Sequence, residues 1–157
     1  MTVPATLPAG HVVTPTEFQG VLDPLLVLTS AWTDYSSTFT ITASTTNPTK
    51  GNSTYNAKYL KIGRTVLVCI TVTIGSTFSR GSGYYGFSVP YAPVIGWSGV
   101  VGHVVDSGTA ERGPMGGRFA GATILGISGT TLISDTSPQT WATGDIIAFT
   151  AVYEAAS

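Results

Sequence analysis

The sequence predicts an all-β protein, specifically an antiparallel β-sandwich or jelly-roll-like domain preceded by an extended N-terminal arm and one short helix. From Ala31 onward, apolar and polar residues alternate in short segments, which is the pattern of strands with one buried face. Clusters of Gly, Pro, Asn and Ser separate these segments, and no helical pattern lies between them. Together these observations favour antiparallel strands over a parallel α/β sheet.

The start of the chain differs from the rest, so we divide it into an arm with a short anchoring helix (1–28) and a β-sandwich domain (29–157). Two early prolines make the opening segment unsuitable for a helix or a central strand. A helix signal follows, because Thr14 is a good N-cap, Pro15 suits the first helical position and Glu17 completes a capping box.

We expect this helix to attach the chain to something larger. Val13 and Phe18 occupy the positions of a hydrophobic staple, and Phe18, Val21, Leu22 and Leu25 fall on one helical side. A helix this short is marginal in water, so its apolar side must dock against another surface. That surface is the chain's own β-domain, a neighbouring subunit or a larger platform, and the sequence leaves these alternatives open.

The strands are expected to be short and evenly spaced. The clearest covers 64–74, where Val and Ile residues face one way while a second set that includes Leu67 and Cys69 faces the other. Ser128 and Gly129 favour a tight hairpin, and the Gly-rich segment 112–118 is expected to be a loop. Further strands are predicted at 39–43, 55–59, 84–89, 99–105, 118–127, 130–134 and 145–153.

The composition favours association with other protein. Charged residues make up only 10% of the chain, against about 25% in a typical domain. Hydroxyl side chains can be covered by a partner at a much smaller desolvation cost than charged ones. The seven Lys and Arg form no basic stripe, so nucleic acid is not an expected partner, and no apolar segment predicts a membrane partner.

No group of residues predicts catalysis, so we expect a protein that is not an enzyme, with no cofactor and no bound metal. His103, Asp106 and Ser107 are close in sequence, but strand alternation places His103 and Asp106 on opposite faces. The two His and one Cys lack the spacing of metal ligands.

Aromatic residues offer the one candidate for ligand or partner contact. Alternation predicts that Tyr85 and Phe87 are core residues and that Tyr84 points outward, which leaves Tyr84, Tyr91 and Trp97 as candidates. Such side chains stack on sugar faces, but they also serve as core, rim or subunit contacts. A carbohydrate-binding module for receptor recognition, like an adhesin or lectin, is therefore the alternative function.

Two parts of the chain resemble the small β-sandwich structural proteins of tailed bacteriophages, especially phages of actinobacteria. The first is GHVVTPTEF at residues 10–18, although Gln19 stands where Asn is common. The second runs from YLKIGRTV at 59–66 through GSTF at 75–78 to YGFSVP at 85–90.

The resemblance implies a subunit on the virion surface, either a capsid decoration protein or a minor tail or fibre component. It further implies a symmetric oligomer, a homotrimer, attached through its N-terminal arm. The expected partners are copies of itself, other virion proteins such as major capsid or tail proteins, and a host surface glycan. It names no catalytic residues and does not choose between head and tail.

Overall fold

A computed structural model describes residues 16, 32–94 and 99–156 of the chain. The residues from Trp32 onward form one compact unit built from strands. The strands are β1 (Thr33–Asp34), β2 (Ile41–Ala43), β3 (Thr54–Ile62), β4 (Thr65–Thr73), β5 (Tyr85–Ser88), β6 (Gly99–Asp106), β7 (Ala110–Ala120), β8 (Thr123–Ser128), β9 (Thr131–Leu132) and β10 (Ile146–Glu154).

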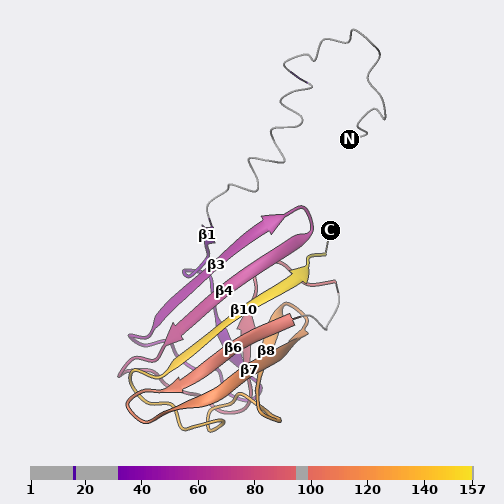
Figure 1. Cartoon of the computed structure of the whole chain (residues 1–157). Helices are drawn as coiled ribbons and strands as arrows, with labels where there is room; N and C mark the ends of the chain where they lie inside the picture. The colour runs from indigo at the N-terminus through magenta and orange to yellow at the C-terminus, as the bar shows by residue number, and fades with distance from the viewer. Residues whose placement is uncertain (1–15, 17–31, 95–98, 157) are drawn as a thin grey trace. The chain divides into compact units, whose positions relative to one another are not determined.

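All of these strands belong to one antiparallel sheet, in the order β1-β3-β4-β10-β6-β7-β8-β5-β2, with β9 paired to β8 (Figure 1). The prediction of an all-β antiparallel fold is confirmed. The finer prediction of a two-sheet sandwich or jelly roll is not, because strand pairing continues without a break from β1 to β2. The sheet instead curls around its own core, as a half-barrel does.

Aromatic contacts across the core show the curl. The ring of Phe87 in β5 lies 5.1 Å from that of Phe149 in β10, although four strand pairings separate the two strands along the sheet. Phe119 in β7 and Tyr153 in β10 have ring centroids 4.8 Å apart. The inner faces of β5 and β10 therefore look at each other, and their outer faces point away from each other.

The segment between β1 and β2 joins the two edges of the sheet. Tyr35, just after β1, packs its ring against Tyr59 of β3 at 5.8 Å, and Phe39, just before β2, packs against Tyr55 of β3 at 5.3 Å. Tyr35 and Phe39 also contact each other at 6.1 Å. Tyr35 and Phe39 belong to the core, and Tyr55 and Tyr59 pack against it.

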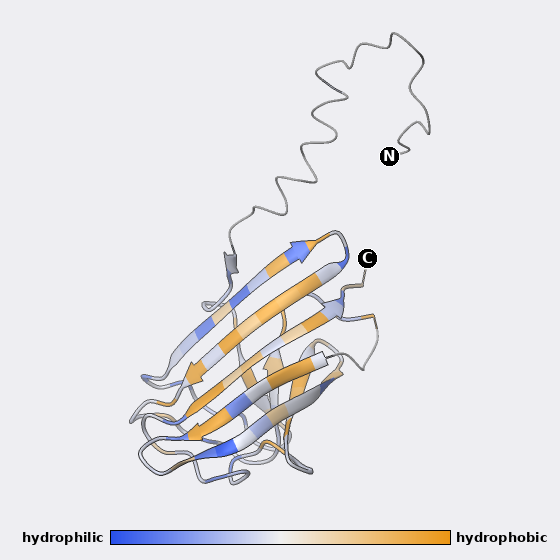
Figure 2. Ribbon diagram, viewed as in Figure 1, coloured by the Kyte–Doolittle hydropathy of each residue, from blue (hydrophilic) through white to orange (hydrophobic). Residues whose placement is uncertain are grey.

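Buried and exposed residues alternate along the strands as the apolar pattern of the sequence predicts. Along β4, Val66, Val68, Ile70 and Val72 are fully buried, as their β-branched pattern predicts. In β10, buried residues likewise alternate with residues that are exposed or half-buried. Figure 2 shows apolar and weakly polar residues along most of β4 and β10.

Glycines make the tight hairpins. Gly63, Gly121 and Gly129 each take the first of the two positions between paired strands, with φ of 59°, 57° and 61°. A positive φ at that position belongs to the type II′ turn, whose twist matches that of a hairpin. The hairpin predicted at Ser128 and Gly129 is confirmed, whereas the single strand predicted over 118–127 is divided by Gly121 into β7 and β8.

The prediction of a loop at 112–118 is wrong, since these residues lie inside β7. Pro114 pairs with His103 at the point where the register between β6 and β7 shifts before Val105. A strand tolerates proline at such an irregularity, because no regular ladder hydrogen bond is lost there. The arm and helix predicted over 1–28 lie outside the described residues, apart from Thr16.

Candidate functional site

The structure places the three residues considered as a catalytic triad, His103, Asp106 and Ser107, in separate environments. His103 is exposed on the outer side of β6, whereas Asp106 forms an ion pair with Arg112. The backbone N–H of Ser107 donates to the buried carboxylate of Asp145, at 2.9 Å. These hydrogen bonds fix the loops around β6 and β7 and do not build a nucleophile beside a base.

Acidic, His and Cys side chains do not gather into a group that could hold a metal ion in the part of the chain that the structure describes. Within residues 16, 32–94 and 99–156 there is also no helix of the length and apolarity that a membrane span requires.

The first surface of interest consists of the side chains of β3, β4, β10 and β6 that point away from the core, and we call it the outer face. Strand register aligns Leu60, Leu67 and Val152 in one row across β3, β4 and β10. The next row contains Cys69, Thr150 and Val101. All of these side chains point away from the core, because they alternate along each strand with residues that face it, which in β3 are Ala57 and the half-buried Tyr59.

Two of the five large apolar side chains that are exposed among the described residues lie on this outer face. Val101 is 72% exposed and Val152 is 47% exposed, and Cys69 is also exposed. No charged side chain points outward between Thr65 and Thr73 of β4 or between Ile146 and Val152 of β10. The central strands β4 and β10 therefore offer leucine, isoleucine, valine, alanine, cysteine and threonine side chains to any partner.

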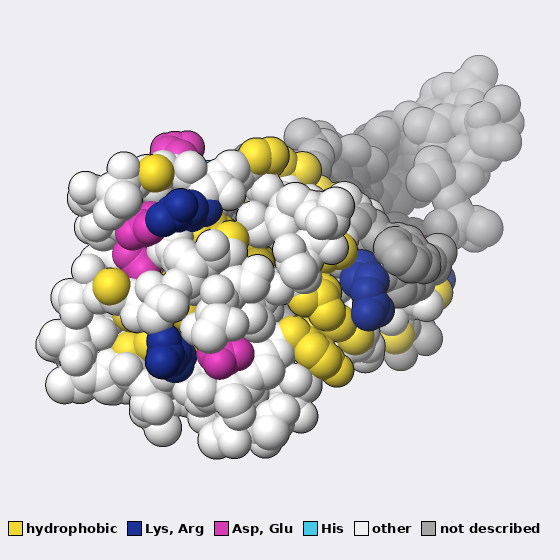
Figure 3. Space-filling view, turned by 90° about the horizontal axis from the view of Figure 1, so that it is seen from below, with side chains coloured by type: hydrophobic (Ala, Val, Ile, Leu, Met, Phe, Trp, Pro, Cys, Tyr) yellow, Lys and Arg dark blue, Asp and Glu magenta, His cyan; other side chains and the backbone are white. Residues whose placement is uncertain are grey.

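Charges near the outer face are few. Glu154, at the end of β10, pairs with Arg64 at 3.1 Å, and Lys58 lies on β3, beside Cys69 in the register. Figure 3 shows another side of the molecule, where charged side chains are also few and lie scattered among uncharged groups. A second protein can cover residues 65–73 of β4 and 146–152 of β10 without separating charged groups from water, whereas Lys58 on β3 must keep its ammonium hydrated.

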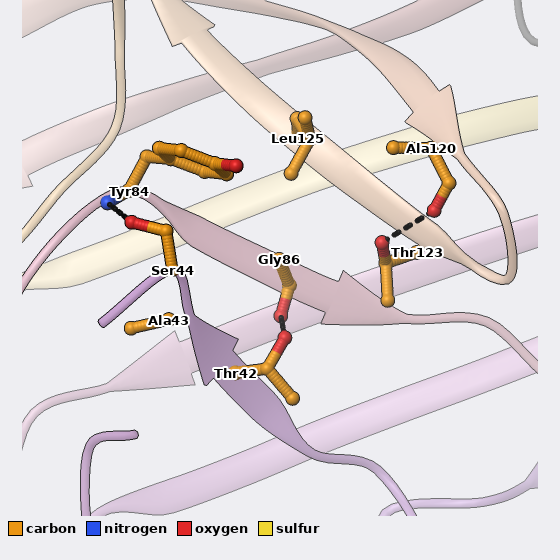
Figure 4. A pocket seen from close by; sticks show the side chains of 8 residues that line it. All are labelled: Thr42, Ala43, Ser44, Tyr84, Gly86, Ala120, Thr123 and Leu125. Carbon is orange, nitrogen blue, oxygen red and sulfur yellow. Dashed lines mark hydrogen bonds between the residues drawn. The ribbon is translucent and has the colours of Figure 1, made fainter. Parts of the chain in front are cut away.

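The second surface of interest is a shallow depression of about 220 Å³ on the outer side of β2, β5 and β8 (Figure 4). Gly86 lies in the middle of it, opposite Thr42 on β2 and Leu125 on β8. Tyr84, Ser44 and Thr123 complete its walls with two alanines. None of its lining side chains is charged at neutral pH.

The structure separates the three aromatic residues predicted as contacts. Tyr84 is 45% exposed, as alternation predicts, and lines the depression. Tyr91 is part of a different group, because its ring packs against Tyr59 at 5.5 Å and under the ammonium of Lys61 at 4.7 Å. The hydrogen bond between the Tyr59 and Tyr91 hydroxyls raises the pKa of Tyr91. Trp97 lies outside the described residues.

The five residues predicted to anchor the chain also lie outside the described residues: Val13, Phe18, Val21, Leu22 and Leu25. In their place the structure draws attention to Leu67, Val101 and Val152, which the sequence did not single out. One sign was present, since the second face of 64–74 carries Leu67 and Cys69 among threonines and has no charged residue. A strand that needs only one buried face has no reason to carry Leu67 on the other.

Comparison with known protein families, curated proteins and solved structures finds no match to this chain. Its function must therefore be inferred from the two surfaces described above.

Proposed function

We propose that this protein is a non-enzymatic structural subunit that assembles with copies of itself through the outer face of β3, β4, β10 and β6. The observation that carries the proposal is Val101, 72% exposed in the middle of a strand that has neighbours on both sides. Apolar side chains of a water-facing sheet are usually replaced by polar ones, and a contiguous group of them marks a protein interface.

A second copy is the partner that fits this face best. Its central strands carry no charged side chain between Thr65 and Thr73 or between Ile146 and Val152, so like-charge repulsion between copies is confined to Lys58 on the neighbouring strand β3. Interfaces of permanent homo-oligomers are also the more apolar class of protein interface. The symmetric assembly that we propose is a homotrimer, in which three copies of the face converge on the three-fold axis and one part of each face contacts a different part of the face of the next subunit.

We further propose that the assembly is part of a bacteriophage virion, as a capsid decoration or a minor tail or fibre component. Support for this comes from the segments at 10–18 and 59–90 that resemble such proteins, and from the low charge of the chain. In this proposal residues 1–28 attach the subunit to a capsid or tail protein, and the curled sheet is the exposed body.

Measuring the mass of the full-length chain by light scattering after size-exclusion chromatography tests self-assembly. The expected result is an oligomer, with the mass of a trimer, that persists at concentrations of about 10 µM, where contacts of about 8 kcal/mol are stable. A monomer at that concentration would contradict the proposal.

Immunogold electron microscopy tests the location in a virion. Antibodies against the chain are expected to label intact phage particles, on the head or on the tail. Label that stays with unassembled protein only would refute a structural role in the particle.

Deletion of residues 1–28 tests the anchoring role. The truncated chain is expected to keep the circular dichroism of a β-protein and to be absent from purified particles. Normal incorporation of the truncated protein would show that the anchor lies elsewhere.

A further inference from the structure

Gly86 gives the first indication that the depression is a binding site. It lies inside β5 between the core residues Tyr85 and Phe87, so a side chain at this position would point outward, into the depression. It is not among the glycines with positive φ, so the backbone does not require glycine there. Glycine weakens a strand interior, and its presence often marks close approach of a ligand or another chain segment.

The space above Gly86 is narrow. A Cβ at this position would lie 2.9 Å from the hydroxyl oxygen of Thr42 and 3.4 Å from Cβ of Thr123. Any larger side chain would therefore fill the depression and push its walls apart. Glycine keeps the floor open while β2, β5 and β8 stay paired.

The hydrogen bonds around the depression determine which groups it offers. The hydroxyl of Thr42 donates to the carbonyl of Gly86 at 3.3 Å, and that of Thr123 donates to the carbonyl of Ala120 at 2.8 Å (Figure 4). A hydroxyl has one proton and two lone pairs, so both threonines keep acceptor capacity toward a ligand.

The hydroxyl oxygen of Ser44 has the opposite role. It accepts the backbone N–H of Tyr84 at 3.2 Å, which leaves its own proton available for donation. The hydroxyl of Tyr84 can donate or accept. The depression therefore presents donors and acceptors together, which is the requirement of a ligand whose own groups are hydroxyls.

The apolar part of the depression is an aromatic platform. Tyr84 extends its ring over the start of β5 toward Leu125 (Figure 4). The ring is 45% exposed, and its neighbour Leu125 lies outside the main core cluster although it is nearly buried. An exposed ring with hydroxyls beside it suits a molecule with one face of C–H groups and a rim of O–H groups.

Because no lining side chain is charged, the depression favours a neutral ligand. An ion would lose its hydration there without gaining an oppositely charged partner. The nearest charged neighbour in the strand register is Arg118, opposite Leu125, and it is not part of the lining. The volume of about 220 Å³ is below the ~300 Å³ at which pockets for whole small molecules begin. One ring-sized unit fits, and the rest of a longer chain would extend into solvent.

We propose that this depression binds one neutral pyranose unit of a glycan, stacked on Tyr84 and hydrogen-bonded by Ser44, Thr42 and Thr123. The site lies on β2, β5 and β8, so it does not depend on self-assembly through the outer face. It goes beyond the structural role proposed above, and either proposal can fail without the other.

Saturation-transfer NMR of the full-length protein with neutral methyl glycosides tests the site. The panel contains the glucoside, galactoside, mannoside and N-acetylglucosaminide. At least one is expected to bind in the millimolar range, which corresponds to about 4 kcal/mol. Tyr84→Ala should weaken that binding about 3- to 10-fold through loss of the stacking ring, whereas Tyr84→Phe should retain most of it.

Two matched variants control the experiment. Trp32→Ala removes an aromatic side chain of nearly equal exposure, 44%, from the residue just before β1, and should leave binding unchanged. Arg118→Gln should also leave it unchanged. The proposal is overturned if no glycoside in the panel binds at concentrations up to about 10 mM. It is equally overturned if a folded Tyr84→Ala variant binds as well as the wild type, or if Arg118→Gln abolishes binding.

Discussion

Replacing Val101 with glutamate should dissociate the proposed oligomer and leave the subunit folded. Val101 lies in β6 and is 72% exposed in the isolated chain. Full burial of a valine side chain stabilises by about 1.5 kcal/mol, so a partner that covers this residue gains about 1 kcal/mol at each copy. A glutamate loses that gain and adds an unpaired carboxylate, which costs about 3 kcal/mol or more when buried.

The sum is about 4 kcal/mol for each contact, which corresponds to an association constant lower by about 700-fold. The effect on the fold is much smaller, because exposed substitutions usually change stability by no more than about 0.5 kcal/mol. Sedimentation equilibrium over a dilution series measures the association, and thermal unfolding monitored by circular dichroism measures the fold.

Thr131→Glu is the matched control. Thr131 is exposed in the short strand β9, on the other half of the sheet, so the variant adds the same charge away from the outer face. It should associate as the wild type does. If Val101→Glu also associates like the wild type, the outer face is not the contact, and the reasoning from its exposed apolar side chains is wrong.

Three further variants test the core and its packing. Phe149→Ala should lower the free energy of unfolding by about 3–5 kcal/mol, because the ring is buried in the core, whereas Thr150→Ala next to it should have little effect in urea titrations. Gly102→Ala should destabilise, since its Cβ would lie 2.1 Å from a carbonyl oxygen of β10, while Gly116→Ala, with no atom closer than 4.0 Å, should not. Burial raises the pKa of Tyr35, whose hydroxyl has no hydrogen-bond partner within the described residues. The unfolded chain therefore loses this proton first, and stability should fall as the pH rises above about 10. Tyr35→Phe should be at least as stable at neutral pH and should show a shallower alkaline loss. A steeper loss in the variant would contradict that explanation.

The parts of the fold that could be predicted from the sequence are those decided locally. Period-two alternation identified β4 and β10 because each buries one face completely, and it correctly oriented Tyr84, Tyr85 and Phe87 in and before β5. The hairpin at Gly129 was also local, since a two-residue turn requires little beyond a glycine at its first position.

The sheet order could not be predicted in this way. β10 lies between β4 and β6, and those pairings join residues that are far apart in the chain. A sandwich and a single curled sheet contain the same alternating strands, so only the long-range pairing distinguishes them. Segment 112–118 shows a related difficulty, because its glycines and proline favour a loop locally while β6 and β8 on either side hold it in a strand.

The candidate sites were predictable to different degrees. Tyr84 was identified from an outward position beside core aromatics, but its partners were not, because Thr42, Ser44 and Thr123 come from β2 and β8 and meet only after the sheet has formed. The outer face was missed because the sequence identifies an apolar residue without showing whether its side of the strand is covered. Leu67 is such a residue, and the exposed Val152 opposite it and Val101 in the next row belong to other strands.

The curl of the sheet determines where the outer face and the depression lie relative to each other. Phe87 and Phe149 meet in the core, so β5 and β10 lie on opposite sides of it, and their outer faces point in opposite directions. Subunits that associate through β10 and its neighbours therefore leave the depression on β5 open to solvent. Val101→Glu should accordingly reduce assembly without changing the affinity of each subunit for a glycoside, and Tyr84→Ala should reduce that affinity without changing assembly. If either variant altered both properties, the two surfaces would not be independent, and the placement of the glycan site away from the subunit contact would have to be abandoned.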